Sequence, residues 1–364
     1  MKLSDITNEL EKLAPLVYAE DFDNVGLLVG DTNAEISKVL VTLDTTEEVV
    51  QEAIEKGANL IVSFHPIIFS GMKKITGKNY VERVVQLAIK NDINIYATHT
   101  ALDNSELGVN YQIAKQLNLK NTKILIPQKD TLRHLVTYVP TENAEKIRNA
   151  LFSAGAGSIG DYDNCSFNLE GTGTFRAGEN ANPFVGEIGK KHFESEIRIS
   201  VIFNKHLQSQ ILNSLKENHP YEEVAYEIFS LENLNQTIGI GIVGELENEI
   251  SEEEFFKYLK DKMNTECIRH SKLLNKKVKR IAVLGGSGSF AIADAKRAGA
   301  DVFVTADLKY HNFFEAENQI LLTDIGHYES EQFTKNLLTA YLSEKFPNFA
   351  VLNSEINTNP VVYN

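Results

Sequence analysis

The sequence has few cysteines and no long apolar run. Its two cysteines, Cys165 and Cys267, are too few and too isolated for a disulfide framework or a thiolate zinc site. No apolar run approaches the roughly 20 residues that a membrane-spanning helix needs. The first residues, MKLSDITNELEKL, have the pattern of an amphipathic helix and not that of a secretory signal. We therefore expect a cytoplasmic protein without a membrane partner.

The chain also has fewer basic than acidic residues. The chain has 36 Lys and Arg residues against 50 Asp and Glu residues, which gives a formal net charge of -14 at pH 7. Such a charge opposes attraction to DNA, RNA or anionic lipid, so no nucleic-acid partner is expected. The hydrophobic share of 43% is that of an ordinary soluble protein. At 364 residues the chain exceeds one usual hydrophobic core, and two or three domains are expected.

The N-terminal part has the pattern of alternating strands and helices. The sequence predicts buried strands at 38–44, 60–64 and 93–98, separated by helices at 45–56 and 80–91. Gly57 follows the first of these helices as a left-handed C-cap. Strands joined by such short helical crossovers usually pair in parallel with a right-handed connection, which predicts an α/β fold.

The same plan recurs near the C-terminus. We predict strands at 279–284, 302–305 and 319–325, a tight loop at 285–288 and a helix at 290–298. In each half a strand ends on a histidine that an acidic residue follows four positions later, as His99 with Asp103 and His327 with Glu331. This correspondence predicts an internally duplicated βαβ core with parallel-rich sheets.

Residues 126–236, between the halves, follow a different order. Strands are expected at 132–139, 196–203 and 224–230, and helices at 143–154 and 205–218, with one more strand in the Gly- and Asn-rich middle. This βαββαβ order predicts a ferredoxin-like α+β domain inserted between core segments 1–125 and 237–364. Such an insertion costs the host little, because loop-closure entropy grows slowly with loop length.

Residues suited to bind a metal follow several of the predicted strands. His327 and Glu331 are four apart and would face the same way on a helical turn. Imidazole with carboxylate suits zinc, iron or manganese better than calcium or copper(I). Taken alone, this pair also fits a solvated helix start, and His65 alone also fits a core or turn histidine. However, strand ends that meet at one sheet edge would bring His65, Asp103, His327 and Glu331 together, which predicts a metal site.

A dinucleotide site is the competing interpretation of the C-terminal glycines. Gly286, Gly288 and Ala291 fit the G-x-G-x-x-A pattern between a strand and a helix, and Asp307 follows about twenty residues later. The same loop could equally hold a phosphate or line a metal cleft. Nicotinamide-cofactor binding therefore stays open as an alternative.

Six short motifs in both halves together resemble the family of GTP cyclohydrolase 1 type 2 homologues, the Nif-three-like proteins. The inserted segment is similar to the PII-like domain of the longer bacterial members. The motifs are Asp23-Asn24-Val25-Gly26-Leu27, SFHPIIF at 63–69, HTALD at 99–103, Gly108-Val109-Asn110, GGSG at 285–288 and GHYESE at 326–331.

The resemblance implies a centre of one or two divalent transition-metal ions per subunit and a ring-shaped homohexamer. Carried over to this sequence, the ligands are His65, Asp103, His327 and Glu331, with Glu331 bridging the two metals. Members usually have two histidines before the proline, whereas this chain has Phe64 before His65. Phenylalanine cannot ligate a metal, so we expect one secure metal position and one weakened position.

The activity that the resemblance implies is metal-assisted hydrolysis, as in a cyclohydrolase acting on a nucleotide or related heterocycle. The catalytic residues stay unassigned; His99 and Asp307 are the nearest candidates for a general base, because both should lie at the same sheet edge. The alternative function is a non-catalytic metal- or ligand-sensing regulatory protein whose inserted segment reports its state or blocks the cleft.

Overall fold

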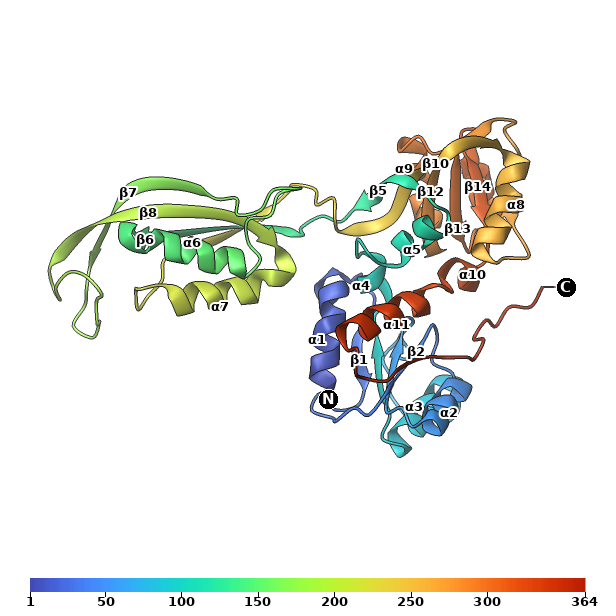
Figure 1. Ribbon diagram of the computed structural model, residues 1–364, viewed down its shortest axis with the longest axis horizontal. Helices are drawn as coiled ribbons and strands as arrows, with labels where there is room; N and C mark the ends of the chain where they lie inside the picture. The colour runs from blue at the N-terminus through green and yellow to red at the C-terminus, as the bar shows by residue number, and fades with distance from the viewer. Residues whose placement is uncertain (364) are drawn as a thin grey trace. The chain divides into compact units, whose positions relative to one another are not determined.

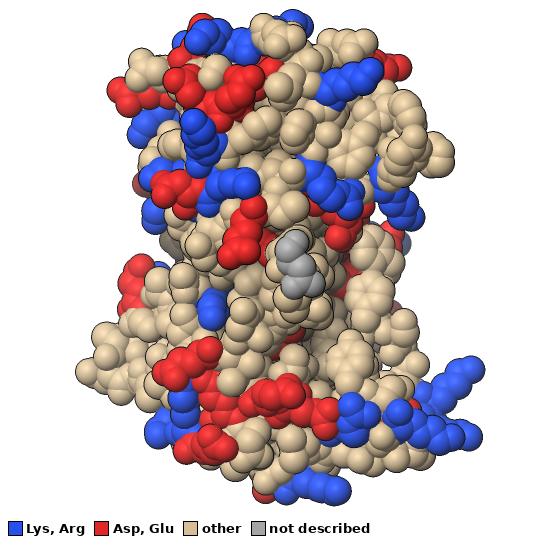
Figure 2. Space-filling model, turned by 90° about the vertical axis from the view of Figure 1, so that its right-hand side faces the viewer, with Lys and Arg blue, Asp and Glu red and all other residues tan. Residues whose placement is uncertain are grey.

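The computed structural model describes residues 1–363 and divides into two compact units (Figure 1). The first unit combines Met1–Pro127 with Gln236–Asn364, and the second unit is Gln128–Asn235. None of the helices among the described residues has the length and apolar composition of a membrane span. On the face of the first unit shown in Figure 2, acidic and basic side chains are intermixed, without a continuous basic surface on that face.

One sheet of the first unit has five strands in the order β1-β4-β3-β2-β15. Strands β2, β3, β4 and β15 are parallel, and β1 pairs with β4 in the antiparallel direction. Every residue of β2, β3 and β4 is buried, as expected of parallel strands covered on both faces. The strand bounds are β1 (Gly26–Val29), β2 (Val39–Thr42), β3 (Leu60–Ser63), β4 (Asn94–Ala97) and β15 (Val351–Asn353).

Helices cover both faces of this sheet. Helices α2 (Glu47–Lys56) and α3 (Tyr80–Lys90) pack on one face, and α1 (Leu3–Leu13) and α11 (Thr334–Lys345) pack on the other. Helix α2 begins where the Thr46 side chain accepts a hydrogen bond from the backbone of Val49. It ends at Gly57, whose φ of 67° confirms the predicted left-handed C-cap.

The other sheet of the first unit has six strands in the order β11-β14-β13-β12-β10-β5. Its central strands β12, β13 and β14 are parallel, and the outer pairs are antiparallel. The bounds are β5 (Lys120–Pro127), β10 (Gly239–Ser251), β11 (Arg269–His270), β12 (Lys277–Ser287), β13 (Val302–Ala306) and β14 (Leu321–Asp324). The mixed α/β class with parallel strands is therefore as predicted.

Two expectations are wrong in detail. The tight loop predicted at 285–288 is largely strand, because β12 continues to Ser287, which pairs with Ala306 after a shift in register. The backbone N–H groups of Gly285 and Gly286 are satisfied by side chains of the first unit, so this end of the strand stays ordered. The candidate ligands also follow strands of two different sheets and not of one edge. They still come together, because one hydrophobic core packs against both sheets.

Short helices continue both sheets at their carboxyl ends. In each half a short helix follows the last parallel strand, α4 after β4 and α10 after β14. The remaining elements of this unit are η1 (Leu16–Tyr18), α4 (His99–Asp103), α5 (Val109–Gln116), α8 (Glu252–Met263), η4 (Ser289–Ala291), α9 (Ile292–Arg297), η5 (Tyr310–Ala316) and α10 (His327–Glu331).

The second unit has one antiparallel sheet in the order β7-β8-β6-β9, with two helices packed on one face (Figure 1). Along the chain its strands and longer helices follow a βαββαβ order. The bounds are β6 (Leu132–Pro140), η2 (Thr141–Asn143), α6 (Ala144–Ser153), β7 (Phe167–Arg176), β8 (Lys191–Asn204), η3 (Lys205–Leu207), α7 (Gln208–Asn218) and β9 (Tyr226–Leu231).

Candidate metal centre

Three of the four predicted ligands converge in the first unit. His65, His327 and Glu331 each offer a ligand atom, and these atoms lie within 4.8 Å of one another. Both imidazoles direct Nε2 at the same atom: Oε2 of Glu331 lies 3.1 Å from Nε2 of His65 and 3.2 Å from Nε2 of His327. Glu331 itself is buried. The three side chains form a group that could hold one metal ion.

Glycines position the carboxylate of Glu331. Helix α10 begins after Gly326, whose φ of 94° favours glycine, and packs against β12. Gly286 of β12 has a φ of 65°, and a Cβ atom there would collide with Oε1 of Glu331. A glycine at position 286 is thus required by the close approach of the Glu331 side chain.

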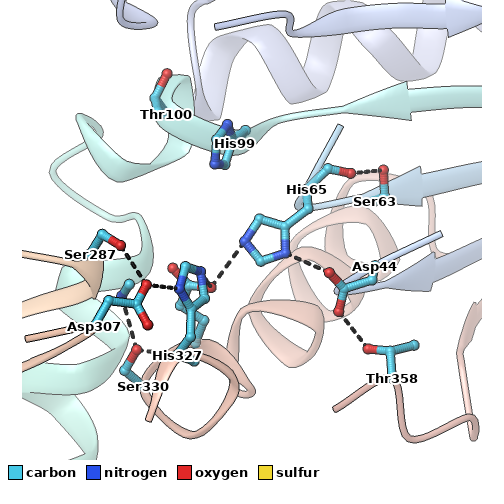
Figure 3. A network of polar contacts seen from close by, with 12 residues as sticks. Asp44, Ser63, His65, His99, Thr100, Ser287, Asp307, His327, Ser330 and Thr358 are labelled. Atoms are coloured by element: carbon cyan, nitrogen blue, oxygen red, sulfur yellow. Dashed lines mark hydrogen bonds and ion pairs between the residues drawn. The ribbon is translucent and has the colours of Figure 1, made fainter. Parts of the chain in front are cut away.

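Two outer carboxylates orient the two imidazoles (Figure 3). Nδ1 of His65 lies 2.8 Å from Asp44, and Nδ1 of His327 lies 2.7 Å from Asp307. A carboxylate accepts hydrogen bonds, so each Nδ1 carries the proton and each Nε2 faces the centre; such carboxylate–histidine pairs are typical around bound metals. Sequence analysis missed Asp44, although it follows β2 just as the recognised residues follow other strands.

The outer carboxylates are held in turn by hydroxyl groups. Asp44 accepts a hydrogen bond from Thr358 at 2.6 Å through its other oxygen. Asp307 accepts a hydrogen bond from the hydroxyl of Ser287. Thr358 belongs to the C-terminal segment, and Ser287 ends β12, so remote parts of the first unit fix the orientation of both rings (Figure 3).

The electrostatics of the cluster are those of two imidazoles around one buried carboxylate. Burial alone would lower the pKa of His65, but the charges of Glu331 and Asp44 raise it to about 10. Burial likewise opposes charge on His327, while the hydrogen bond to Asp307 and the ion pair with Glu331 raise its pKa to about 11. Burial would raise the pKa of Glu331, which the two histidines instead lower to about 2. Without a cation, the cluster therefore takes up two protons.

Asp103 is the fourth predicted ligand and lies at the end of α4. It is buried, and its Oδ1 has no hydrogen-bond partner among the described residues. Burial, followed by the charge of Glu331, raises its pKa well above the usual range. A buried carboxylate oxygen without a partner costs about 1–3 kcal/mol or more, unless a cation binds it. Asp103 therefore fits the donor set, although it stands outside the group of three.

His99 has the same spacing to Asp103 as His327 has to Glu331, but a different arrangement. Its Nδ1 lies 2.8 Å from Asp23, and its backbone φ is 24°. The ring of His99 is 5.4 Å from that of His65 between centroids. The His99 ring is thus a third imidazole with its Nδ1 held by a carboxylate. Its Nε2 has no partner among the described residues.

Phe64 occupies the position next to these imidazoles. Its side chain is fully buried, and its ring centroid lies 4.8 Å from that of His65 and 5.6 Å from that of His99. The aromatic ring fills space beside the centre without offering a ligand atom.

The dinucleotide interpretation meets an obstacle at Gly286. The carboxylate of Glu331 lies where a Cβ atom of Gly286 would be, and a carboxylate there repels a pyrophosphate. Ser287 and Asp307, which belong to the same pattern, are hydrogen-bonded to each other, and Asp307 also holds His327. The geometry therefore disfavours a nicotinamide cofactor at this strand end.

A model of the family described as Duf34/NIF3 (NGG1p interacting factor 3) matches residues 1–360. The chain belongs to this family. A Duf34/NIF3 relative from Bacillus subtilis, named GTP cyclohydrolase 1 type 2 homolog, is 40% identical over 358 residues, which are 97% of this chain and 96% of the relative. A relative of the same name from Staphylococcus aureus is 38% identical, and the match covers 100% of this chain and 100% of the relative. The predicted resemblance is thereby confirmed.

A solved structure supports the same assignment. The Bacillus cereus protein related to NIF3 is 37% identical and superposes with a TM-score of 0.89, over 100% of this chain and 99% of that protein. The similarity to these Duf34/NIF3 proteins thus includes both units of the chain.

Proposed function

We propose that this Duf34/NIF3 protein binds a divalent transition metal through His65, Asp103, His327 and Glu331 and is a metal-dependent hydrolase. One observation carries the proposal: two imidazoles with Nδ1 held by carboxylates direct Nε2 at one buried carboxylate oxygen. In neutral imidazoles of this tautomer, each Nε2 lone pair would face the negative charge of Glu331. Either two added protons or a cation between the groups removes that repulsion.

The donor set supports zinc, iron or manganese over calcium. Two imidazole nitrogens with carboxylate oxygens suit these metals, whereas calcium takes oxygen ligands almost entirely. We propose that the group of three holds one ion, with Asp103 as a further ligand. A second ion, bridged by Glu331, would lack a protein ligand where Phe64 stands, so we propose that it binds weakly.

The residues of the centre have distinct parts in the proposed reaction. A bound cation of this kind lowers the pKa of a water and polarises a carbonyl or phosphoryl oxygen. Asp44 and Asp307 keep the two imidazoles oriented and are positioning residues, which argues against Asp307 as the general base. His99 has Nε2 unbonded beside His65, so it is the better placed group to accept or deliver a proton.

The substrate that we propose is a nucleotide or a related heterocycle. This class comes from the name of the relatives, GTP cyclohydrolase 1 type 2 homolog. We further propose a cytoplasmic, ring-shaped homohexamer, without nucleic acid or membrane as partner. Both cysteines are free thiols, in keeping with a reducing compartment.

Two proposals concern the origin of the fold. The matching order of strands and short helices in the two halves supports an internal duplication of segments 1–125 and 237–364. The βαββαβ order of the second unit supports an inserted PII-like, ferredoxin-like domain at 126–236.

A non-catalytic sensor is the alternative function. It is favoured by a large cavity that belongs to the second unit alone, where an effector could bind apart from the metal ligands. Turnover assays of the metal-loaded protein with GTP and related nucleotides separate the two functions. Turnover supports the hydrolase, whereas no turnover, together with effectors that change the protease sensitivity of residues 126–236, supports the sensor.

Elemental analysis tests the metal site itself. Protein purified without chelators should contain zinc, iron or manganese, and Glu331→Ala should remove most of it. Glu344→Ala, at a side chain that is 74% exposed, is the matched control and should keep the metal. Unchanged metal content in Glu331→Ala would refute the assignment.

A further inference from the structure

The second unit contains a cavity of about 660 Å³. All of its lining residues lie between positions 138 and 225, so it belongs to this unit alone. Ile197 and Ile199 of β8 pack into the core beneath the helices. Since side chains alternate along a strand, Glu196 and Arg198 face the other side, where the cavity is. Its volume lies within the range of about 300–1,000 Å³ that is usual for small-molecule sites.

A buried carboxylate forms the floor of this cavity. Glu196 is only 9% exposed, and its Oε1 accepts a hydrogen bond of 2.7 Å from the hydroxyl of Tyr221. Its Oε2 has no partner among the described residues. A Cβ atom at Gly173 would collide with Oε2, so the glycine on β7 makes room for the carboxylate. Oε2 can therefore accept hydrogen bonds from a ligand in the cavity that Glu196 lines.

Aromatic rings flank this carboxylate. The ring centroid of Tyr221 lies 6.3 Å from that of Phe175 and 6.3 Å from that of Phe184. All three residues line the cavity. Such rings offer flat apolar faces to a planar ligand, while the carboxylate and the hydroxyl offer polar groups at one end.

The HPYEE segment at 219–223 builds this site. The backbone N–H of Tyr221 donates to Nδ1 of His219 at 3.1 Å, and Nε2 of His219 donates to the Tyr138 carbonyl at 3.1 Å. These two bonds fix a neutral tautomer of His219 and the place of Tyr221. Glu222 accepts a hydrogen bond of 2.9 Å from the Asn182 backbone, which ties down the loop that carries Phe184.

The charges of the cavity restrict the ligand. Three further carboxylates line it, those of Glu170, Glu222 and Glu223. Arg198 is the counter-charge on the same strand face, and it forms no ion pair among the described residues. An acidic surplus disfavours a polyanion such as a triphosphate and favours a ligand with N–H donors and at most one small anionic group.

We propose that this cavity binds a planar heterocycle with two adjacent N–H donors, of the guanine or pterin type. The donor edge meets the carboxylate of Glu196, and the ring lies against the aromatic side chains. Oε2 of Glu196, together with the acceptor position that Oε1 keeps beside its bond from Tyr221, matches two adjacent N–H groups, as in charge-assisted bidentate pairs. The site is separate from the proposed metal ligands, so a variant can lose heterocycle binding and keep metal binding, or the reverse.

Calorimetric titration of the full-length protein with guanosine tests the proposal. We expect saturable binding, at least tenfold weaker for inosine, which lacks one of the two donors, and none for adenosine. Glu196→Gln should weaken guanosine binding at least tenfold, because the side-chain amide of glutamine would place an N–H donor opposite the N–H donors of guanosine. Glu145→Gln, an exposed carboxylate of α6, should have no effect. Glu331→Ala should lose metal and keep guanosine binding, which distinguishes this proposal from the metal proposal.

A second pair of variants does not depend on changing the carboxylate. Gly173→Ala should displace Glu196 and abolish binding, whereas Gly178→Ala, where a Cβ atom meets nothing within 4 Å, should leave it intact. Thermal melts show whether each variant is folded. Absence of saturable binding of both guanosine and pterin, or equal affinity in Glu196→Gln, would overturn the proposal. A third result would also overturn it: the unchanged protein does not bind guanosine, and Phe184→Ala abolishes its self-association. The face that carries the cavity would then be an interface between copies.

Discussion

Nε2 of His65 lies 3.1 Å from Oε2 of Glu331, although the two residues follow strands of different sheets. The two halves of the first unit therefore each supply part of the proposed ligand set: His65 and Asp103 from one half, His327 and Glu331 from the other. The hydrophobic core shared by both sheets holds these sets together. Any change that shifts one half against the other should reduce metal binding before it unfolds the protein.

Asp44→Asn should weaken metal binding by about 10- to 100-fold, the usual cost of losing an outer carboxylate. The variant keeps the shape of the side chain but can present an N–H group to Nδ1 of His65, which then loses its orientation. Competition with a coloured chelator measures the affinity. Asp31→Asn, at an exposed residue, is the control. Equal affinities of Asp44→Asn and the unchanged protein would show that the outer carboxylate does not act through His65.

Gly286→Ala and Gly299→Ala form a matched pair. Both glycines have a left-handed backbone, with φ of 65° and 68°, so an added Cβ costs each variant about 1–2 kcal/mol of strain. At Gly299 the Cβ meets nothing within 4 Å, whereas at Gly286 it collides with Glu331. Urea unfolding should show a larger loss of stability for Gly286→Ala, and only this variant should lose metal. Similar stability and metal content in both would contradict the close approach of Glu331.

The stability of the fold should depend on pH through Asp23. Its side chain is fully buried, and burial alone would raise its pKa, but hydrogen bonds from His99 and Thr100 lower it to about 2. In the unfolded chain the pKa of an aspartate is about 3.9. Ionised Asp23 therefore adds up to about 2 kcal/mol to the free energy of unfolding above pH 4, and this contribution is lost as the pH falls toward 2. Urea unfolding at pH 6, 4 and 3 should show a smaller loss of stability for Asp23→Asn than for the unchanged protein; the loss that remains in the variant includes that of Glu331, whose pKa is also lowered to about 2.

Asp21→Asn is the control for this pH dependence, because Asp21 is an exposed neighbour on the same turn. It should follow the unchanged protein at every pH. A stability difference between Asp23→Asn and the unchanged protein that stays constant from pH 6 to pH 3 would rule out Asp23 as the titrating group.

The sequence was a good guide to local features of the centre and a poor guide to its surroundings. The spacing of His327 and Glu331 on a helical turn predicts that they face the same way, and in the structure Nε2 of His327 lies 3.2 Å from Oε2 of Glu331. The same spacing fails for His99, because its acceptor, Asp23, lies on a distant loop and its backbone φ of 24° is not encoded by residue type. Likewise, Asp44 and His65 follow the neighbouring parallel strands β2 and β3, and only the pairing of these two strands reveals that Asp44 holds His65.

Phe64→His should raise the metal content from one ion per chain to two. The ring of Phe64 is fully buried beside His65 and His99, so an imidazole there would be the ligand that the second position lacks. Phe64→Leu is the matched control, since it removes the aromatic ring without adding a nitrogen. Both variants should lose about 1–3 kcal/mol of stability from imperfect core packing, but only Phe64→His should bind the second ion. Anomalous scattering that shows two equally occupied metals in the unchanged protein would contradict this prediction, because a bridging Glu331 would then hold the second ion without the residue at position 64.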